Sequence, residues 1–200
     1  MRKAGIDKAI KRLSKCKDSM QELLKSASFD EMEAAWEDYL ISAHAIYEIL
    51  KHSSKGNGKS EAWFGRKVRI RKSDELLKYL HHARNSNEHS LRDSTVRRPG
   101  SVAFGVAKPG FSSDIFINKF EMKDGKILSC DMASLDGKPI LNQFTPGKIT
   151  LLSVMDSGQK YDIPSTHLGK DVSSKTIFQL CEISHAYFSS LVSEAKSYID

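Results

Sequence analysis

The stretch Tyr79-Leu-His-His-Ala-Arg-Asn-Ser-Asn-Glu-His-Ser90 is the polar half of a segment whose apolar residues recur at helical spacing. Upstream of it, Ser73 and Asp74 are both suitable N-caps, and acidic residues favour the first turn of a helix. The helix is therefore expected to begin there and to run to about Leu91. Its apolar face should consist of Leu76, Leu77, Leu80 and Ala83.

Two helices are predicted before this one. Apolar or small residues recur every three or four positions from Ile6 to Ala27, and this period indicates one helix. Ser28-Phe-Asp-Glu31 has the form of a capping box, so a second helix is expected to start there. The buried face of that helix should be Met32, Trp36, Tyr39, Ala43, Ile46 and Leu50. Glycines and small polar residues at 53–58 predict a loop, and the chain from there to the third helix is expected to be a connection.

A β-rich segment follows the third helix. All five prolines lie between Pro99 and Leu168, among alternating runs typical of strands. Strands are expected at 102–106, 114–122, 126–132, 148–155 and 160–163, with hairpin turns at 123–126 and 156–158. After Asp171 the helical period returns, and this last helix is expected to pack onto the first three.

The sequence therefore predicts an α+β fold, in which a four-helix bundle is interrupted by a small all-β insertion between the third and last long helices. The bundle would comprise residues 1–98 plus 169–200, and the β-rich insertion module residues 99–168. With 200 residues the chain is long enough for one core, or for one core and a small second module.

The composition argues against several protein classes. Hydrophobic residues make up 40% and charged residues 28%, and no apolar run approaches the roughly 20 residues that span a bilayer. No apolar segment of a secretory signal follows Met1, so a cytoplasmic protein without membrane contact is expected. Cys16, Cys130 and Cys181 lack the spacing of a zinc site and are expected to be free, buried or half-buried thiols.

The formal charge of +6 is concentrated around the third helix. The window from Gly65 to Arg98 contains ten basic and four acidic residues, so the whole excess of positive charge in the chain lies there. A basic footprint of this kind is typical of a protein that binds a polyanion, although a solvated, soluble surface has the same composition.

Three residues near the end of the third helix combine phosphate binding with proton transfer. The guanidinium of Arg84 can hold two oxygens of a phosphodiester, and the imidazole of His89 can exchange a proton at neutral pH. On a regular helix Asn85 and His89 are about 40° apart, whereas Arg84 and His89 are about 140° apart. Arg84 and His89 converge only if the arginine wraps around the helix, if the helix ends near His89, or if two copies of the chain pair across a twofold axis.

At Arg84, Asn85 and His89 the chain resembles the HEPN superfamily, whose pattern is an arginine, a polar residue and, four to six residues after the arginine, a histidine. The setting is also similar, because HEPN proteins are small helical bundles with this motif on a late helix, and many pair through it. The resemblance covers the helical parts and not the β insertion. It implies a metal-independent endoribonuclease of a toxin, antiphage or RNA-processing system, without a cofactor.

The resemblance implies a role for each residue of the motif. His89 would act as general base or acid, Arg84 would bind the scissile phosphate, and Asn85 would orient His89 or the phosphate. RNA and a second copy of the chain are the expected partners, and an antitoxin or other protein on the β insertion is a further one. A catalytically inactive module that binds nucleic acid or protein is the alternative. The expected RNA-binding residues are Arg66, Lys67, Arg69, Arg71, Lys72, His82 and Arg92.

The positions of two further histidines and of the two tryptophans indicate their roles. His82 and His89 share a helix face, but they lack a carboxylate at matching spacing, so His82 is expected to add hydrogen bonding or charge rather than to bind a metal. His81 is expected to face solvent. Trp36 should lie in the core, whereas Trp63 either stacks on unpaired bases or packs the connection between helices.

Overall fold

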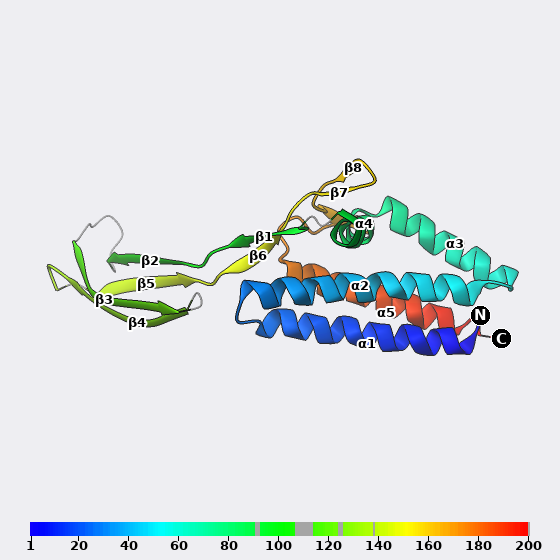
Figure 1. Cartoon of the computed structure of the whole chain (residues 1–200), viewed down its shortest axis with the longest axis horizontal. Coiled ribbons are helices and arrows are strands. Elements are labelled where there is room, and N and C mark those ends of the chain that lie inside the picture. The colour runs from blue at the N-terminus through cyan, green and yellow to red at the C-terminus, as the bar shows by residue number, and fades with distance from the viewer. Residues whose placement is uncertain (91–92, 107–113, 124–125, 138, 200) are drawn as a thin grey trace.

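The computed structural model describes residues 1–90, 93–106, 114–123, 126–137 and 139–199, and within these ranges the chain is a mixed α+β protein (Figure 1). The described residues form five helices and ten short strands, and every strand lies between the fourth and fifth helices in the sequence. The helices are α1 (Lys3–Lys25), α2 (Phe29–Ser54), α3 (Gly58–Ser73), α4 (Glu75–Ser90) and α5 (Ile177–Lys196).

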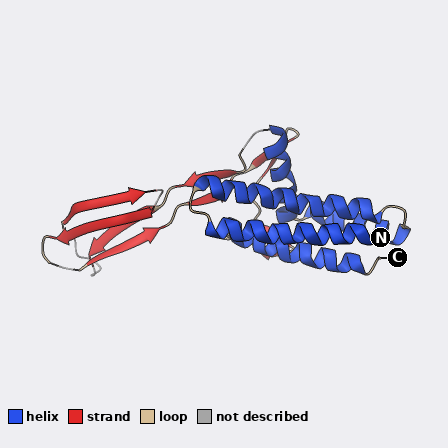
Figure 2. Ribbon diagram, turned by 60° about the horizontal axis from the view of Figure 1, so that its bottom comes forward, coloured by secondary structure: helices blue, strands red, loops and turns tan. Residues whose placement is uncertain are grey.

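The helices α1, α2 and α5 run side by side, and α4 crosses them. Figures 1 and 2 show that the axes of the first three are nearly parallel, while α4 is seen almost end-on in Figure 1. Their shared core contains the expected face of α2, with Trp36, Tyr39, Ile46 and Leu50 almost completely buried. The capping box that starts α2 is present, since the Glu31 amide donates to the Ser28 hydroxyl. No helix in the described part of the chain has the length and apolar character needed to cross a bilayer.

The expectation of four helices is wrong, because residues 58–73 form a helix rather than a connection. Asn57 caps α3 by accepting hydrogen bonds from the amides of Lys59 and Ser60, at 3.0 and 3.1 Å. Few residues of α3 are buried, and its apolar residues do not recur at a helical period. The sequence pattern therefore does not predict this helix. Trp63 is one of them: it is 2% exposed and donates to Glu194 at 3.2 Å, which confirms the packing alternative.

Part of the β-rich segment projects away from the helices as an arm (Figure 1). The strands β2 (Ser101–Val106) and β5 (Ile140–Thr145) form one antiparallel pair of the arm, and β3 (Ile115–Lys123) and β4 (Lys126–Ser134) form the other. The pair of β1 (Thr95–Arg98) and β6 (Lys148–Leu151) connects the arm to the helices. Large apolar side chains are exposed on the β3–β4 hairpin, among them Phe116, Ile117, Met122 and Leu128.

The chain returns from the arm along the helices. Its strands are β7 (Val154–Asp156), β8 (Gln159–Tyr161), β9 (Thr166–His167) and β10 (Lys170–Asp171). Ile149, Leu151, Val154 and Val172 join the helical core, and the first three of them belong to the segment 99–168 that the sequence assigns to the β module. The predicted strand at 148–155 is interrupted after Leu151, and β1, β5, β9 and β10 lie outside the predicted strands.

The predicted turn at 156–158 is confirmed. Ser157 and Gly158 join β7 to β8 with positive φ angles of 51° and 79°, as a two-residue hairpin turn requires. The other predicted turn, at 123–126, falls on residues 124–125, which lie outside the described residues.

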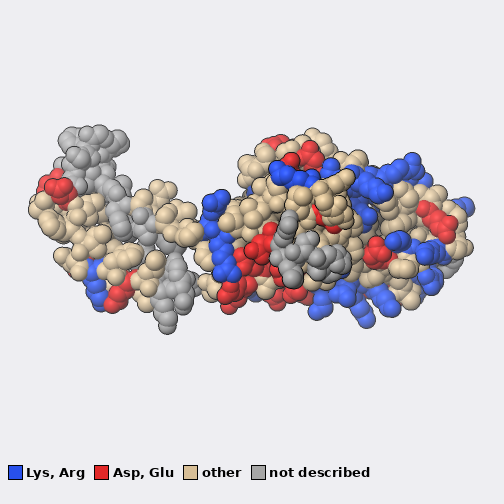
Figure 3. Space-filling view, turned by 45° about the horizontal axis from the view of Figure 1, so that its top comes forward, with Lys and Arg blue, Asp and Glu red and all other residues tan. Residues whose placement is uncertain are grey.

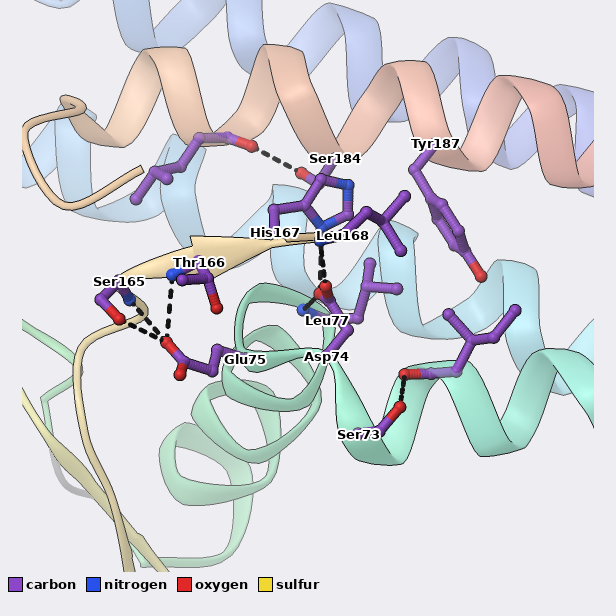
Figure 4. A network of polar contacts seen from close by, with 12 residues as sticks. Ser73, Asp74, Glu75, Leu77, Ser165, Thr166, His167, Leu168, Ser184 and Tyr187 are labelled. Atoms are coloured by element: carbon purple, nitrogen blue, oxygen red, sulfur yellow. Dashed lines mark hydrogen bonds and ion pairs between the residues drawn. The ribbon is translucent and has the colours of Figure 1, made fainter. Parts of the chain in front are cut away.

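The carboxylate of Asp74 joins the start of α4 to the returning strands. Figure 4 shows Asp74 between α4 and β9. Its Oδ1 accepts the Leu77 amide at 2.9 Å, which confirms the predicted N-cap, and also lies 3.0 Å from His167 Nδ1. Its Oδ2 accepts the Leu168 amide at 2.7 Å. Because Asp74 and His167 are both buried, one carboxylate fixes α4 against a strand that is more than 90 residues away in the sequence.

We expect Asp74→Ala to lower the free energy of unfolding by about 2–4 kcal/mol, because it removes the cap and leaves the buried His167 ring and Leu168 amide without their acceptor. Urea denaturation followed by circular dichroism measures the change. Glu75→Gln is the matched control, since Glu75 accepts from Ser165 and Thr166 at a more exposed position and its glutamine oxygen still accepts (Figure 4). Equal stability of the two variants would contradict the role of Asp74.

Candidate active site

A single carboxylate organises the polar face of α4. Asp156 Oδ2 lies 2.7 Å from His82 Nδ1 and accepts a hydrogen bond from Asn85 Nδ2 at 2.9 Å. His82 and Asn85 are three residues apart and therefore lie on one face of α4. Asp156 is the last residue of β7 and is held in turn by the Ser157 hydroxyl, which donates to its Oδ1 at 3.1 Å. The hairpin thus brings to α4 an acidic group that the sequence analysis did not select.

The ionisation state of Asp156 determines which ring nitrogen of His82 carries a proton. Partial burial alone would raise the pKa of Asp156, but the hydrogen bonds from His82, Asn85 and Ser157 outweigh burial and lower the pKa below its usual value. The group is therefore an ionised carboxylate at neutral pH and can only accept hydrogen bonds. It follows that His82 Nδ1 carries a proton, and that in the neutral ring Nε2 is the basic nitrogen.

Tyr161 covers one face of the His82 ring. The two rings are stacked, with centroids 3.5 Å apart and planes 11° apart. Tyr161 comes from β8, which is paired with β7, so the same two-stranded hairpin supplies both the carboxylate and the stacked ring. Hydrogen bonding and stacking together fix the orientation of the imidazole, which nevertheless remains 20% exposed.

Asn85 joins Arg84 to this group. Its amide nitrogen donates to Asp156 while its carbonyl oxygen accepts from Arg84 Nη1 at 3.4 Å. Of the three predicted catalytic residues, the structure thus brings Arg84 and Asn85 together and adds His82 and Asp156 to them. Residue 89 lies in α4, but the side chain of His89 is outside the described part of the structure, and so is Arg92.

His81, the residue before His82 on α4, is paired with another histidine. The rings of His81 and His44 are stacked with centroids 5.2 Å apart, and their Nδ1 atoms are 3.3 Å apart. His81 is half-buried, so the expectation that it faces solvent is wrong. Burial, reinforced by the charge of Arg71 and by the neighbouring histidines, lowers the pKa of His81 to about 3. His81 is therefore neutral at neutral pH.

The basic residues of α3 separate into two groups. Lys67 forms an ion pair with Glu194 at 2.6 Å, and Arg71 lies 4.8 Å from the centre of the Tyr47 ring, so both have partners within the protein. Arg66, Arg69 and Lys72 are exposed and recur every three residues, which places them on one face of α3. Figure 3 shows lysine and arginine side chains gathered over the helical part of this face of the molecule.

Part of the predicted basic excess is neutralised elsewhere. Arg97 in β1 forms ion pairs with Asp30 and Glu33, both at 2.5 Å. It therefore connects the base of the arm to the start of α2. Within the described part of the 65–98 window, the exposed cations on one helix face are those of α3, whereas Arg97 is paired with carboxylates.

Across the described ranges, no group of three or more His, Cys, Asp or Glu residues is placed to hold a metal ion. The three cysteines are free, with Cys16 and Cys181 buried and Cys130 half-buried, as predicted. Burial raises the pKa of the Cys16 thiol to about 12, so this thiol is not a nucleophile at neutral pH.

No family model matches the chain, and no curated protein or solved structure matches it.

We expect the stability of the protein to fall as the pH drops below about 6.5, in part because of His81. The pKa of His81 is lowered to about 3 in the folded state, so between these values the unfolded chain takes up a proton that the folded chain does not. His81→Gln should flatten this part of the pH dependence. Urea denaturation from pH 4 to pH 7 measures it, with His52→Gln at an exposed position as control. An unchanged pH dependence in His81→Gln would contradict the assignment.

Proposed function

We propose that this protein is a metal-independent endoribonuclease whose active site is the polar face of α4. One observation carries the proposal: Asn85 joins Arg84, a phosphate-binding cation, to an imidazole that a carboxylate orients. The resemblance of Arg84, Asn85 and His89 to the HEPN motif supports the same reaction. A helical bundle of HEPN type, interrupted by the β strands, is part of this proposal.

The proposed reaction is transesterification by the 2′-hydroxyl of RNA. Arg84 binds the scissile phosphate and stabilises the charge that builds on its oxygens. Asn85 keeps the guanidinium in place through its 3.4 Å hydrogen bond. His89 exchanges a proton with the 2′-hydroxyl or with the leaving 5′-oxygen, and the products are a 2′,3′-cyclic phosphate and a 5′-hydroxyl.

The exposed face of α3 is the proposed binding surface for the RNA backbone. Arg66, Arg69 and Lys72 present cations on one helix face, and α3 ends one residue before α4 begins. Phosphate contacts of this kind position the nucleic acid without reading its sequence. His82 and Arg71, which the sequence analysis assigned to RNA binding, have contacts within the protein that suit them better to organising the site.

A homodimer completes the proposal. On a single regular helix, positions 84 and 89 lie about 140° apart around the axis, and two copies related by a twofold axis would supply both groups to each of two sites. We place the protein in the cytoplasm as a toxin or antiphage component. The β2–β5 arm has no chemical role in the proposal, and an antitoxin or other protein partner for it stays a prediction.

The first test is cleavage of total RNA and of a defined RNA oligonucleotide in the presence of a chelator. We expect the wild-type protein to leave 2′,3′-cyclic phosphate ends under these conditions. Arg84→Ala and His89→Ala should each cut about a hundredfold to ten-thousandfold more slowly. His52→Gln is the control for loss of a histidine far from α4. Cleavage by His89→Ala at the wild-type rate would reject the proposal.

The second test addresses RNA binding by α3. The triple variant Arg66→Gln, Arg69→Gln, Lys72→Gln should bind single-stranded RNA more weakly, and the slope of log Kd against log salt should fall by about 2 if each cation contacts one phosphate. Fluorescence anisotropy measures both quantities. A matched triple variant removes three exposed lysines of α1, at Lys8, Lys11 and Lys15. An equal loss of affinity in the two variants would show that only net charge matters.

A further inference from the structure

We propose that His82 is a proton-transfer group of the RNA-cleaving site, with Asp156 as its positioning residue. This inference rests on the proposed function and deepens it, because the motif that suggested a nuclease contains one histidine, whereas an in-line cleavage of RNA needs a base and an acid. His82 supplies the base, and the proposed role of His89 then becomes that of the acid.

The tautomer of His82 suits a base. The Asp156 carboxylate accepts from Nδ1 at 2.7 Å, so the lone pair of the neutral ring lies on Nε2, at the opposite side of the imidazole. Among the described residues no hydrogen-bond partner of Nε2 is found. A carboxylate behind a histidine also stabilises the imidazolium that forms when the ring takes up a proton.

The orientation of the ring is fixed before any substrate binds. Tyr161 is stacked on His82 at 3.5 Å, the His81 ring is T-shaped to it with centroids 5.0 Å apart, and Asp156 holds Nδ1. A group that is already oriented loses little conformational entropy on reaching the transition state. The hydrogen bond from Asn85 to Asp156 already attaches β7 to α4. The contacts that orient the His82 ring are therefore additional to those that hold the strand.

The hydrogen bonds place the imidazole in one group with the phosphate-binding cation. Arg84 donates to Asn85, and Asn85 and His82 both contact Asp156 Oδ2. On a regular helix Arg84 and His82 lie about 160° apart, so the phosphodiester beside His82 is held by Arg84 of the twofold-related copy, as proposed for His89. This neighbourhood distinguishes His82 from His81, whose contacts are with His44 and which lies near Arg71.

His82 Nε2 takes the proton of the 2′-hydroxyl, the 2′-oxygen forms a bond to phosphorus, and the bond from phosphorus to the 5′-oxygen breaks. The leaving 5′-oxygen takes a proton from His89. The charged and titratable groups around His82 are Asp156 and Tyr161 from the β7–β8 hairpin, His81 beside it on α4, and His44 and Arg71 behind His81.

The test compares two substrates over a range of pH. One is an RNA dinucleotide, and the other is a nucleoside 3′-(4-nitrophenyl phosphate), whose leaving group needs no acid. We expect His82→Gln, which retains a donor for Asp156, to slow cleavage of both substrates about a hundredfold or more and to remove the acidic limb of the pH–rate profile. A variant of the acid, His89→Ala, should recover most of its loss with the nitrophenyl ester.

Asp156 is tested as a positioning residue with two variants. Asp156→Asn should slow cleavage about tenfold or more, because an amide nitrogen facing Nδ1 favours the other tautomer, and Asp156→Glu should restore part of the rate. Nitrogen-15 NMR of the histidine rings gives a readout that is independent of activity. We expect the Nδ1–H tautomer for His82 in the wild-type protein and its loss in Asp156→Asn, with thermal melting to confirm that each variant is folded.

The outcomes separate the two proposals. If the wild-type protein cleaves and His82→Gln cleaves within threefold of it, the role of His82 is overturned and the nuclease proposal stands. An Nε2–H tautomer of His82 in the wild-type protein would also overturn it. If the wild-type protein cleaves neither substrate in the presence of a chelator, both proposals fall together.

Discussion

The carboxylate of Asp74 is the contact on which the position of α4 depends. It caps the first turn of α4 and binds both His167 and the amide of Leu168 on the returning chain. Leu168 has a φ angle of 48°, a left-handed conformation that costs a residue with a side chain about 1 kcal/mol, and the hydrogen bond to Asp74 helps to hold it there. Since Glu75 accepts from Ser165 and Thr166 at the next position, the start of α4 and the strand β9 behave as one unit.

The same principle recurs two turns further along α4. Asp156 accepts hydrogen bonds from His82 and Asn85, and Tyr161 of the adjacent strand is stacked on the imidazole. In both places an acidic group bridges α4 and the strands that follow the arm, although one carboxylate belongs to the helix and the other to the hairpin. The helix is consequently held by polar contacts along the side on which Asn85 reaches Arg84, while its leucines face the core.

The helices with a strong apolar period could be predicted from sequence, and so could the N-caps of α2 and α4. Ser28 with Glu31, and Asp74, act as expected, because a cap is a local feature. The helix α3 was missed because it buries few residues and is stabilised by contacts such as Lys67 with Glu194, which no local pattern reveals. Asp156 was recognised only as part of a turn. Its pairing with His82 joins residues 74 positions apart, so only the three-dimensional fold could show that they form one site.

The order of the elements along the chain has a consequence for synthesis. Arg84, Asn85 and His82 are translated before the arm, whereas the carboxylate that orders them arrives only at residue 156, after the β2–β5 strands. A ribosome-bound chain that has not yet returned from the arm therefore carries the cation and the imidazole without the group that aligns them. Maturation of this face of α4 is thus coupled to completion of a distant hairpin, and a prematurely terminated product lacks the alignment altogether.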